Sequence, residues 1–173
     1  MKPILTLANK THEKFLRKKT IPFPFLKFSK KEITVLLKEM REAMKSAQGI
    51  GLSANQIGLE HKVFVALVPQ AQGAAKFYAV FNPKLEKTGN EVVPFEEGCL
   101  SVPGVTEEVT RSEHIEVHYQ DRFGKTQRMG ANGLFAVAIQ HENDHLDGVL
   151  FIEKLSPLKR RLVKRQLSKA VTL

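Results

Sequence analysis

The stretch Gln140-His141-Glu142-Asn143-Asp144-His145 contains two histidines four residues apart, with a glutamate directly after the first. On a helix, residues i and i+4 lie one above the other on the same face, so both imidazoles can reach one metal ion. Glu142 lies about 100° round the helix from His141. This is too far round for a third ligand, but it suits a general base that holds a water at the ion. The alternative is a pair of surface histidines whose hydrogen bonds are satisfied. The glutamate and the apolar residues that precede His141 favour the metal site.

The residues around this stretch predict the helix itself. Its period comes from residues that follow one another at steps of three and four, namely Leu134, Val137, Ala138, His141 and His145. Asn132-Gly133 marks its start, and Gly148 marks its end. Because apolar residues occupy much of 134–139 on all sides, we expect this helix to be central and buried.

Two histidines alone make an incomplete site, since a catalytic zinc-type centre has three protein ligands and one position open for water. Phe151 stands where one peptidase pattern has a further histidine, and nothing acidic follows Glu153 to serve as a downstream ligand. The third ligand must therefore come from upstream. Cys99 is the one cysteine of the chain, and a thiolate is a strong ligand for such an ion. A buried, inert residue is the alternative for a lone cysteine; the flanking Gly98 and the missing ligand weigh against it.

The composition indicates a soluble protein with one domain. A chain of 173 residues is an ordinary length for a single domain and can bury a core without disulfides. One cysteine allows no internal disulfide and fits a reducing compartment. No secretory signal follows Met1, and no apolar run approaches the roughly 18 residues of a membrane span. We therefore expect a cytoplasmic protein without a membrane partner, in which residues 1–173 form one domain.

Further elements can be predicted outward from the central helix. We expect residues 8–28 to be irregular, because Pro22 and Pro24 exclude a helix there. Ser29 and Glu32 form a capping box that opens a helix ending near residues 47–49. The β-rich runs and their turns predict strands at 62–68 and 77–81, a loop at 69–75, and a hairpin of 114–119 with 125–129.

The C-terminal segment is strongly basic. The whole chain has a formal net charge of +9, and from Lys154 onward it carries Lys and Arg but no Asp or Glu. Ser156-Pro157 predicts the start of a helix over about 156–170. We expect its apolar residues to face inward: Leu158, Leu162, Val163 and Leu167. Taken alone, the charge indicates either a nucleic-acid partner or a solvated helix face, and the second is the simpler interpretation.

A glycine-rich loop, residues 49–58, reads Gly-Ile-Gly-Leu-Ser-Ala-Asn-Gln-Ile-Gly. It is a weak candidate for a phosphate cradle, because no strand precedes it and no Lys-Ser/Thr pair follows. A turn or close backbone packing explains its glycines equally well. A third interpretation is a loop whose bare backbone approaches a ligand.

Three segments together resemble the peptide deformylase family. The family carries a Gly-x-Gly-Leu-Ala-Ala-x-Gln loop, a Glu-Gly-Cys-Leu-Ser segment and a Gln-His-Glu-x-Asp-His helix, in that order. The matching segments here are residues 49–56, 97–101 and 140–145. Ser53 stands where alanine is usual and Asn55 where proline is common, and Glu153-Lys154 replaces a more usual Asp-Arg. We expect the first two departures to affect loop stiffness more than activity, and the third to alter a structural ion pair.

The resemblance implies an enzyme that removes the formyl group from the N-terminal formyl-methionine of newly synthesised polypeptides and releases formate. It implies an α+β fold in which antiparallel strands surround the metal-binding helix. It also implies that Cys99, His141 and His145 hold one divalent ion. Ferrous iron (Fe²⁺) is the family's usual metal, with Zn²⁺, Ni²⁺ or Co²⁺ able to replace it; the ligand set alone suits zinc equally well.

The resemblance also implies roles for residues near the ion. Glu142 would act as base, while the Leu100 backbone N–H and the Gln56 side-chain amide would face the oxygen that gains negative charge. Ile50, Gly51 and Gly98 would contact the substrate, the first two through backbone pairing like an added strand. Val137 and Ala138 can line a methionine pocket or belong to the core. The basic C-terminal helix gains a candidate partner in the ribosome, whose RNA suits a basic face.

Two other functions compete with this interpretation. The first is a metallopeptidase that cuts internal bonds, although the third-ligand patterns of such enzymes are absent here. The second is a basic RNA-binding module with a structural metal. The chain lacks Trp and any aromatic–basic recognition motif, and a structural site tends to be closed by four protein ligands.

Overall fold

The structure, a computed structural model, describes residues 2–68 and 74–170, with residues 168–170 described for their backbone alone. The helices are α1 (Lys10–Leu16), α2 (Lys30–Ser46), α3 (Gly133–Leu146) and α4 (Pro157–Ala170), and the short 3-10 helices are η1 (Phe25–Lys27), η2 (Ala54–Ile57) and η3 (Phe151–Lys154). The strands are β1 (Gly51–Ser53), β2 (Val63–Val68), β3 (Lys76–Lys87), β4 (Val92–Cys99), β5 (Val102–Ser112), β6 (His114–Gln120) and β7 (Thr126–Asn132).

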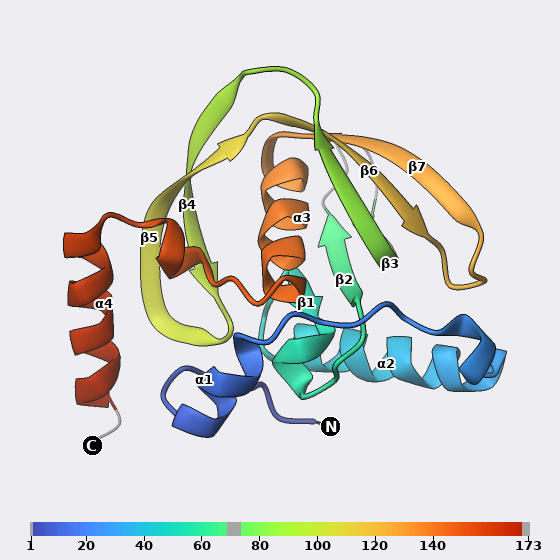
Figure 1. The fold of residues 1–173 in the computed structure, drawn as a ribbon, viewed down its shortest axis with the longest axis horizontal. Coiled ribbons are helices and arrows are strands. Elements are labelled where there is room, and N and C mark those ends of the chain that lie inside the picture. Colours follow the sequence, from blue (N-terminus) through green and yellow to red (C-terminus); the bar gives the residue numbers. More distant parts are fainter. Residues whose placement is uncertain (1, 69–73, 171–173) are drawn as a thin grey trace.

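Two antiparallel sheets lie on either side of α3 (Figure 1). The larger sheet has five strands in the order β1-β2-β3-β6-β7, and β4 pairs with β5 in a separate two-stranded sheet. Figure 1 shows α3 standing between them, with α4 beyond β5 at the far side of the smaller sheet. The arrangement confirms the α+β fold that the sequence predicted, with a helix held among antiparallel strands.

The helix α2 begins at the predicted capping box. The Glu32 backbone N–H donates to Ser29 Oγ (3.2 Å), and the Ser29 backbone N–H donates to Glu32 Oε2 (2.7 Å). Two orphan donors at the helix start are thereby satisfied. The apolar stripe of α2, which includes Ile33, Met40 and Met44, packs in one buried cluster with residues of β1 and β2.

The helix α3 is bounded by glycines in the left-handed region. Gly133 has φ of +51° and Gly148 has φ of +76°. At Gly148 a Cβ would lie 2.4 Å from the Arg17 carbonyl oxygen, so glycine is required there by close approach as well as by conformation. Ala136 and Ile139 of α3 pack with buried residues of the larger sheet, which confirms that the helix is central and buried.

The N-terminal region differs from the prediction. Residues 10–16 form the helix α1, where the sequence predicted irregular chain. Asn9 caps this helix, because its side-chain oxygen accepts from the backbone N–H groups of Thr11 (2.8 Å) and His12 (3.2 Å). The prolines that argued against a helix lie beyond its end, so they exclude helix only in their own surroundings.

The backbone of this region also ties two later segments together. The Leu5 N–H donates to the Gln56 carbonyl oxygen (2.7 Å), and the Leu7 N–H donates to the Ser101 carbonyl oxygen (2.9 Å). Residues 5–7 therefore link η2 to the turn between β4 and β5.

The predicted strand at 77–81 is longer in the structure, where β3 runs from Lys76 to Lys87. The hairpin of 114–119 with 125–129 is confirmed as β6 and β7. The predicted loop at 69–75 falls largely outside the described residues, which omit 69–73. No strand was predicted at residues 92–99 or 102–112, which form β4 and β5.

The C-terminal helix is present where predicted, but only half of its apolar residues face inward. Val163 and Leu167 are buried against η3 and β5. Leu158 and Leu162 are 61% and 57% exposed, so the expectation that they face the core was wrong. Among the described residues, no helix combines the length and the apolar character that crossing a membrane requires.

Candidate active site and metal centre

Three predicted ligands converge at the centre of the molecule. Cys99 ends β4, while His141 and His145 lie one turn apart on α3. The ligand atoms of these residues all lie within 4.8 Å of one another. Cys99 Sγ is 3.1 Å from His145 Nε2. One thiol and two imidazoles, which are distant in sequence, therefore face a common point.

The surroundings of the two histidines suit a bound cation. His141 Nδ1 is 2.8 Å from Glu97 Oε2, which leaves Nε2 free to act as a ligand. Burial opposes a charge on His141, but hydrogen bonds to Cys99 and Glu97 outweigh it and raise its pKa well above the ordinary value. Burial, together with the charges of His141 and Arg111, lowers the pKa of His145. A divalent ion held between the two rings would take the place of the proton that these surroundings favour on His141, because a histidine ligand must be neutral.

Glu97 anchors His141 and is itself held by an arginine. Arg111 on β5 donates to both Glu97 oxygens, from Nε at 2.6 Å and from Nη2 at 2.9 Å, and its Nη1 donates to Asp144. Lys154 Nζ lies 3.1 Å from the same Asp144 carboxylate. Burial would raise the pKa of Glu97, but the hydrogen bonds from Arg111 and His141 outweigh it and lower that pKa to about 2. Glu97 is therefore an anion that fixes the His141 ring.

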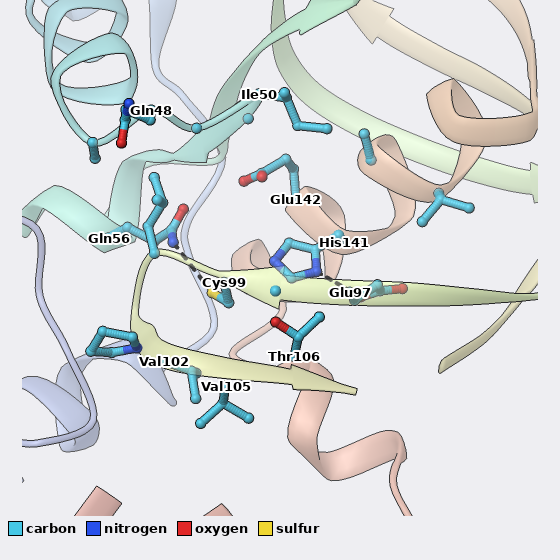
Figure 2. A pocket seen from close by; sticks show the side chains of 18 of the residues that line it. Gln48, Ile50, Gln56, Glu97, Cys99, Val102, Val105, Thr106, His141 and Glu142 are labelled. Carbon is cyan, nitrogen blue, oxygen red and sulfur yellow. Dashed lines mark hydrogen bonds and ion pairs between the residues drawn. The ribbon is translucent and has the colours of Figure 1, made fainter. Parts of the chain in front are cut away.

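The spacing of Glu97 and Cys99 is a sequence signal for the role of Glu97. Glu97 and Cys99 are two residues apart on β4, so their side chains leave the same face of the strand. Figure 2 shows both beside His141. Arg111 carried no comparable signal, because its approach to Glu97 depends on the pairing of β4 with β5.

Glu142 is almost fully buried, at 5% exposure, beside the three candidate ligands. Burial raises its pKa to about 7, although the charge of His141 and a hydrogen bond from Ser53 oppose the rise. Gly51 of β1 packs directly on this carboxylate, because a Cβ at Gly51 would lie 2.3 Å from Glu142 Oε1. A carboxyl group with a pKa near neutrality can both take up and release a proton.

Gln56 is buried in η2 with its amide oriented by three contacts. Its Oε1 accepts from the Ser53 backbone N–H (2.8 Å), and its Nε2 donates to Ser101 Oγ (3.1 Å) and lies 3.7 Å from Cys99 Sγ. The donor end of the amide therefore points toward the candidate metal ligands, as Figure 2 shows. The backbone of Leu100 follows Cys99 directly.

A cavity of about 700 Å³ opens onto these residues. Its wall includes the predicted substrate contacts Ile50, Gly51 and Gly98, and on α3 it includes Val137 and Ala138. The described residues contain one other group of possible ligands, Glu86, Glu116 and His118. Glu116 is paired there with Arg128 and lies 2.6 Å from His118, so this carboxylate already has a basic partner.

Comparison with known proteins identifies the family. The family model described as polypeptide deformylase matches residues 1–161. The chain is 43% identical over 155 residues to a peptide deformylase of Xylella fastidiosa, covering 89% of each protein. It is 46% identical over 124 residues to that of a Picosynechococcus strain, which covers 72% of this chain and 66% of the relative.

The fold agrees with this relationship. The crystal structure of a peptide deformylase from Legionella pneumophila superimposes with a TM-score of 0.85 at 35% identity, covering 98% of this chain and 95% of the other. Sequence, fold and the grouping of thiol, imidazoles and carboxylate all lead to the same family. The chain belongs to the peptide deformylases, the hydrolases that remove the N-formyl group from newly synthesised polypeptides.

Proposed function

We propose that Cys99, His141 and His145 hold one divalent cation at which the formyl amide is hydrolysed. The observation on which this assignment rests is that their ligand atoms all lie within 4.8 Å of one another. A bound cation would supply Lewis acidity, polarising the attacking water and the formyl carbonyl. We propose Fe²⁺ as the physiological metal, with Zn²⁺, Ni²⁺ or Co²⁺ as substitutes that the thiolate and imidazole set also accepts.

We assign the proton transfers to Glu142. Its carboxylate accepts a proton from the attacking water, whose oxygen forms the new bond to the formyl carbon. It then passes the proton to the amine nitrogen as the C–N bond breaks, releasing formate and a free N-terminus. The burial of Glu142 and the rise of its pKa to about 7 support this double role.

Gln56 and Leu100 are assigned to the oxygen that gains negative charge. The Gln56 amide is held with its NH₂ group toward the site by Ser53 and Ser101. The Leu100 backbone N–H is the proposed second donor. Preorganised donors of this kind typically contribute about 3–4 kcal/mol each to the stabilisation of the transition state.

The substrate chain is proposed to lie along the backbone of Ile50, Gly51 and Gly98. β1 is an edge strand of the larger sheet, pairing only with β2 among the described strands, so it can accept an added strand. The apolar cavity wall formed by Val137 and Ala138 suits a methionine side chain. We propose that residues 1–173 act together as one catalytic domain, because the contributing residues come from β1, η2, β4 and α3.

The ribosome is the proposed partner of α4, which would place the reaction in the cytoplasm where nascent chains emerge. Arg161 and Arg165 are exposed on this helix, and so are Leu158 and Leu162. Basic residues favour ribosomal RNA electrostatically. The exposed leucines give the same helix an apolar strip that a solvated face does not require.

Metal analysis combined with formate release tests the central proposal. Protein purified without oxygen should contain one divalent ion per chain and release formate from a formyl-Met peptide. It should leave acetyl-Met peptides and internal bonds intact. Cleavage of internal bonds would favour the metallopeptidase alternative, and bound metal without formate release would favour a structural site.

Cys99→Ser tests the ligand assignment. Loss of the thiolate should lower metal content and formate release together, by about tenfold or more, because even outer contacts of metal sites cost tenfold to a hundredfold when removed. Thr106→Ser on the same cavity wall is the control and should change neither quantity. A Cys99→Ser protein with full metal content and full rate would remove Cys99 from the site.

A further inference from the structure

We propose that the Ser53 hydroxyl is a positioning residue that holds the Glu142 carboxylate in its reactive orientation. The inference rests on the proposed role of Glu142 as the base. It concerns a side chain that the sequence suggested would affect loop stiffness more than activity.

The contact between these residues is short and fully enclosed. Ser53 ends β1 and has no exposed surface. Its Oγ lies 2.8 Å from Glu142 Oε2 and also 2.8 Å from the Glu142 backbone carbonyl oxygen. A hydroxyl has a single hydrogen, so it serves one acceptor at a time, and the charged carboxylate is the stronger of the two.

The Glu142 carboxylate has few other restraints. Among the described residues, Ser53 is the one hydrogen-bond donor that the carboxylate meets. Its other oxygen packs against the bare backbone at Gly51. β1 therefore contacts the carboxylate at both oxygens, by a hydrogen bond at Oε2 and by packing at Oε1. Without the hydroxyl, the carboxylate would be held by packing contacts alone.

Ser53 also touches the second proposed catalytic group, Gln56. Its N–H donates to Gln56 Oε1 (2.8 Å). The Ser53 side chain also takes part in the capping box that opens η2 with Gln56. A double-mutant cycle with Glu142 is therefore needed to separate an effect on Glu142 from an effect on Gln56.

The family motif usually has alanine at this position, so the hydroxyl contact is not essential to the shared chemistry. We therefore expect a moderate effect on turnover. Loss of one net hydrogen bond corresponds to a decrease in rate of about 3- to 10-fold.

The test compares Ser53→Ala with Thr20→Val. Thr20 is also buried, and its Oγ1 donates to the Leu146 carbonyl oxygen of α3 at 2.8 Å, outside the proposed catalytic contacts. Both variants remove one buried hydroxyl that donates to α3, so both should lose similar thermal stability. Only Ser53→Ala should lower kcat, with KM and metal content unchanged. An unchanged kcat in Ser53→Ala, or equal decreases in both variants, would overturn the proposal.

A double-mutant cycle shows whether Ser53 acts through Glu142. In a Glu142→Gln background, where the base is absent, adding Ser53→Ala should not lower the residual kcat further. The same fold decrease in both backgrounds would contradict the proposal. Glu142→Gln separates the positioning role of Ser53 from the assignment of Glu142 as the base. If Glu142→Gln retains wild-type turnover, the base assignment fails. If Glu142→Gln loses turnover but Ser53→Ala does not, only the positioning role of Ser53 fails.

Discussion

Gly51 gives the most direct test of how closely the carboxylate of Glu142 must be placed. A Cβ added at Gly51 would lie 2.3 Å from Glu142 Oε1, so Gly51→Ala must displace the carboxylate. We expect kcat to fall by about 100-fold, because misplacement by about 1 Å can cost that much. Steady-state formate release measures the change.

Gly130→Ala on β7 is the matched control, because a Cβ there meets no atom within 4 Å. It should leave kcat unchanged. Gly51→Ala with wild-type turnover would mean that the carboxylate does not need its position beside β1.

At the level of single residues, the groups with distinctive chemistry could be predicted from the sequence. The residues that orient those groups could not. Cys99, His141 and His145 stood out by residue type and spacing, and the structure brings them together. Ser53 was expected to affect loop stiffness more than activity, and its hydroxyl contacts Glu142. A serine has no spacing rule that reveals its partner, since the contact joins β1 to a helix far along the chain.

The strand β5 contributes to the site through one buried ion pair with β4. The side chains of Arg111 and Glu97 are 3% and 4% exposed. Arg111→Met would leave Glu97 buried without its main partner, which should lower the free energy of unfolding by about 3–5 kcal/mol. Denaturant-induced unfolding measures the loss.

Arg128→Met is the control for this prediction. Arg128 pairs with Glu116 but is 70% exposed, and such surface pairs contribute little to stability. Equal losses in the two variants would show that the Glu97–Arg111 pair is no more important than a surface contact.

Elements with local signals could be predicted from the sequence, and elements defined by distant contacts could not. The helix α2 carried a capping box, and α4 carried serine followed by proline at its start. β4 contains Pro94 and Gly98, and these obscure the alternation that marks a strand. Its partner β5 shows no clear period either, and it is the pairing of the two strands that defines them.

At the scale of the whole molecule, α4 extends the enzyme beyond its catalytic centre. Arg161→Glu with Arg165→Glu reverses exposed charge on this helix without removing the buried Val163 and Leu167. We expect affinity for ribosomes to fall by roughly tenfold or more, because contacts with phosphate dominate such binding. Hydrolysis of free formyl peptides should not change. Co-sedimentation with ribosomes measures the first quantity and formate release the second.

Lys30→Glu with Lys31→Glu is the control, because it makes the same change of net charge on exposed residues at the start of α2. Equal weakening in both double variants would indicate general attraction to RNA. Undiminished binding in the α4 variant would remove this helix from the docking surface.

The prediction that strands surround α3 rested on the family resemblance rather than on a local sequence pattern. Periodicity predicted a buried helix, but it did not say which strands would cover it. That arrangement depends on β4 and β5 folding back as a separate sheet, which brings Cys99 to the histidines.

The first residues of the chain have a consequence for how the enzyme can be inactivated. Leu5 and Leu7 donate main-chain hydrogen bonds to Gln56 and Ser101, so the first residues connect η2 to the turn between β4 and β5. A protease that cleaves the chain just before Ala8 would remove these two hydrogen bonds and leave every proposed ligand and the base in the protein. Limited digestion at this end should therefore yield a trimmed enzyme that still carries its metal but works slowly.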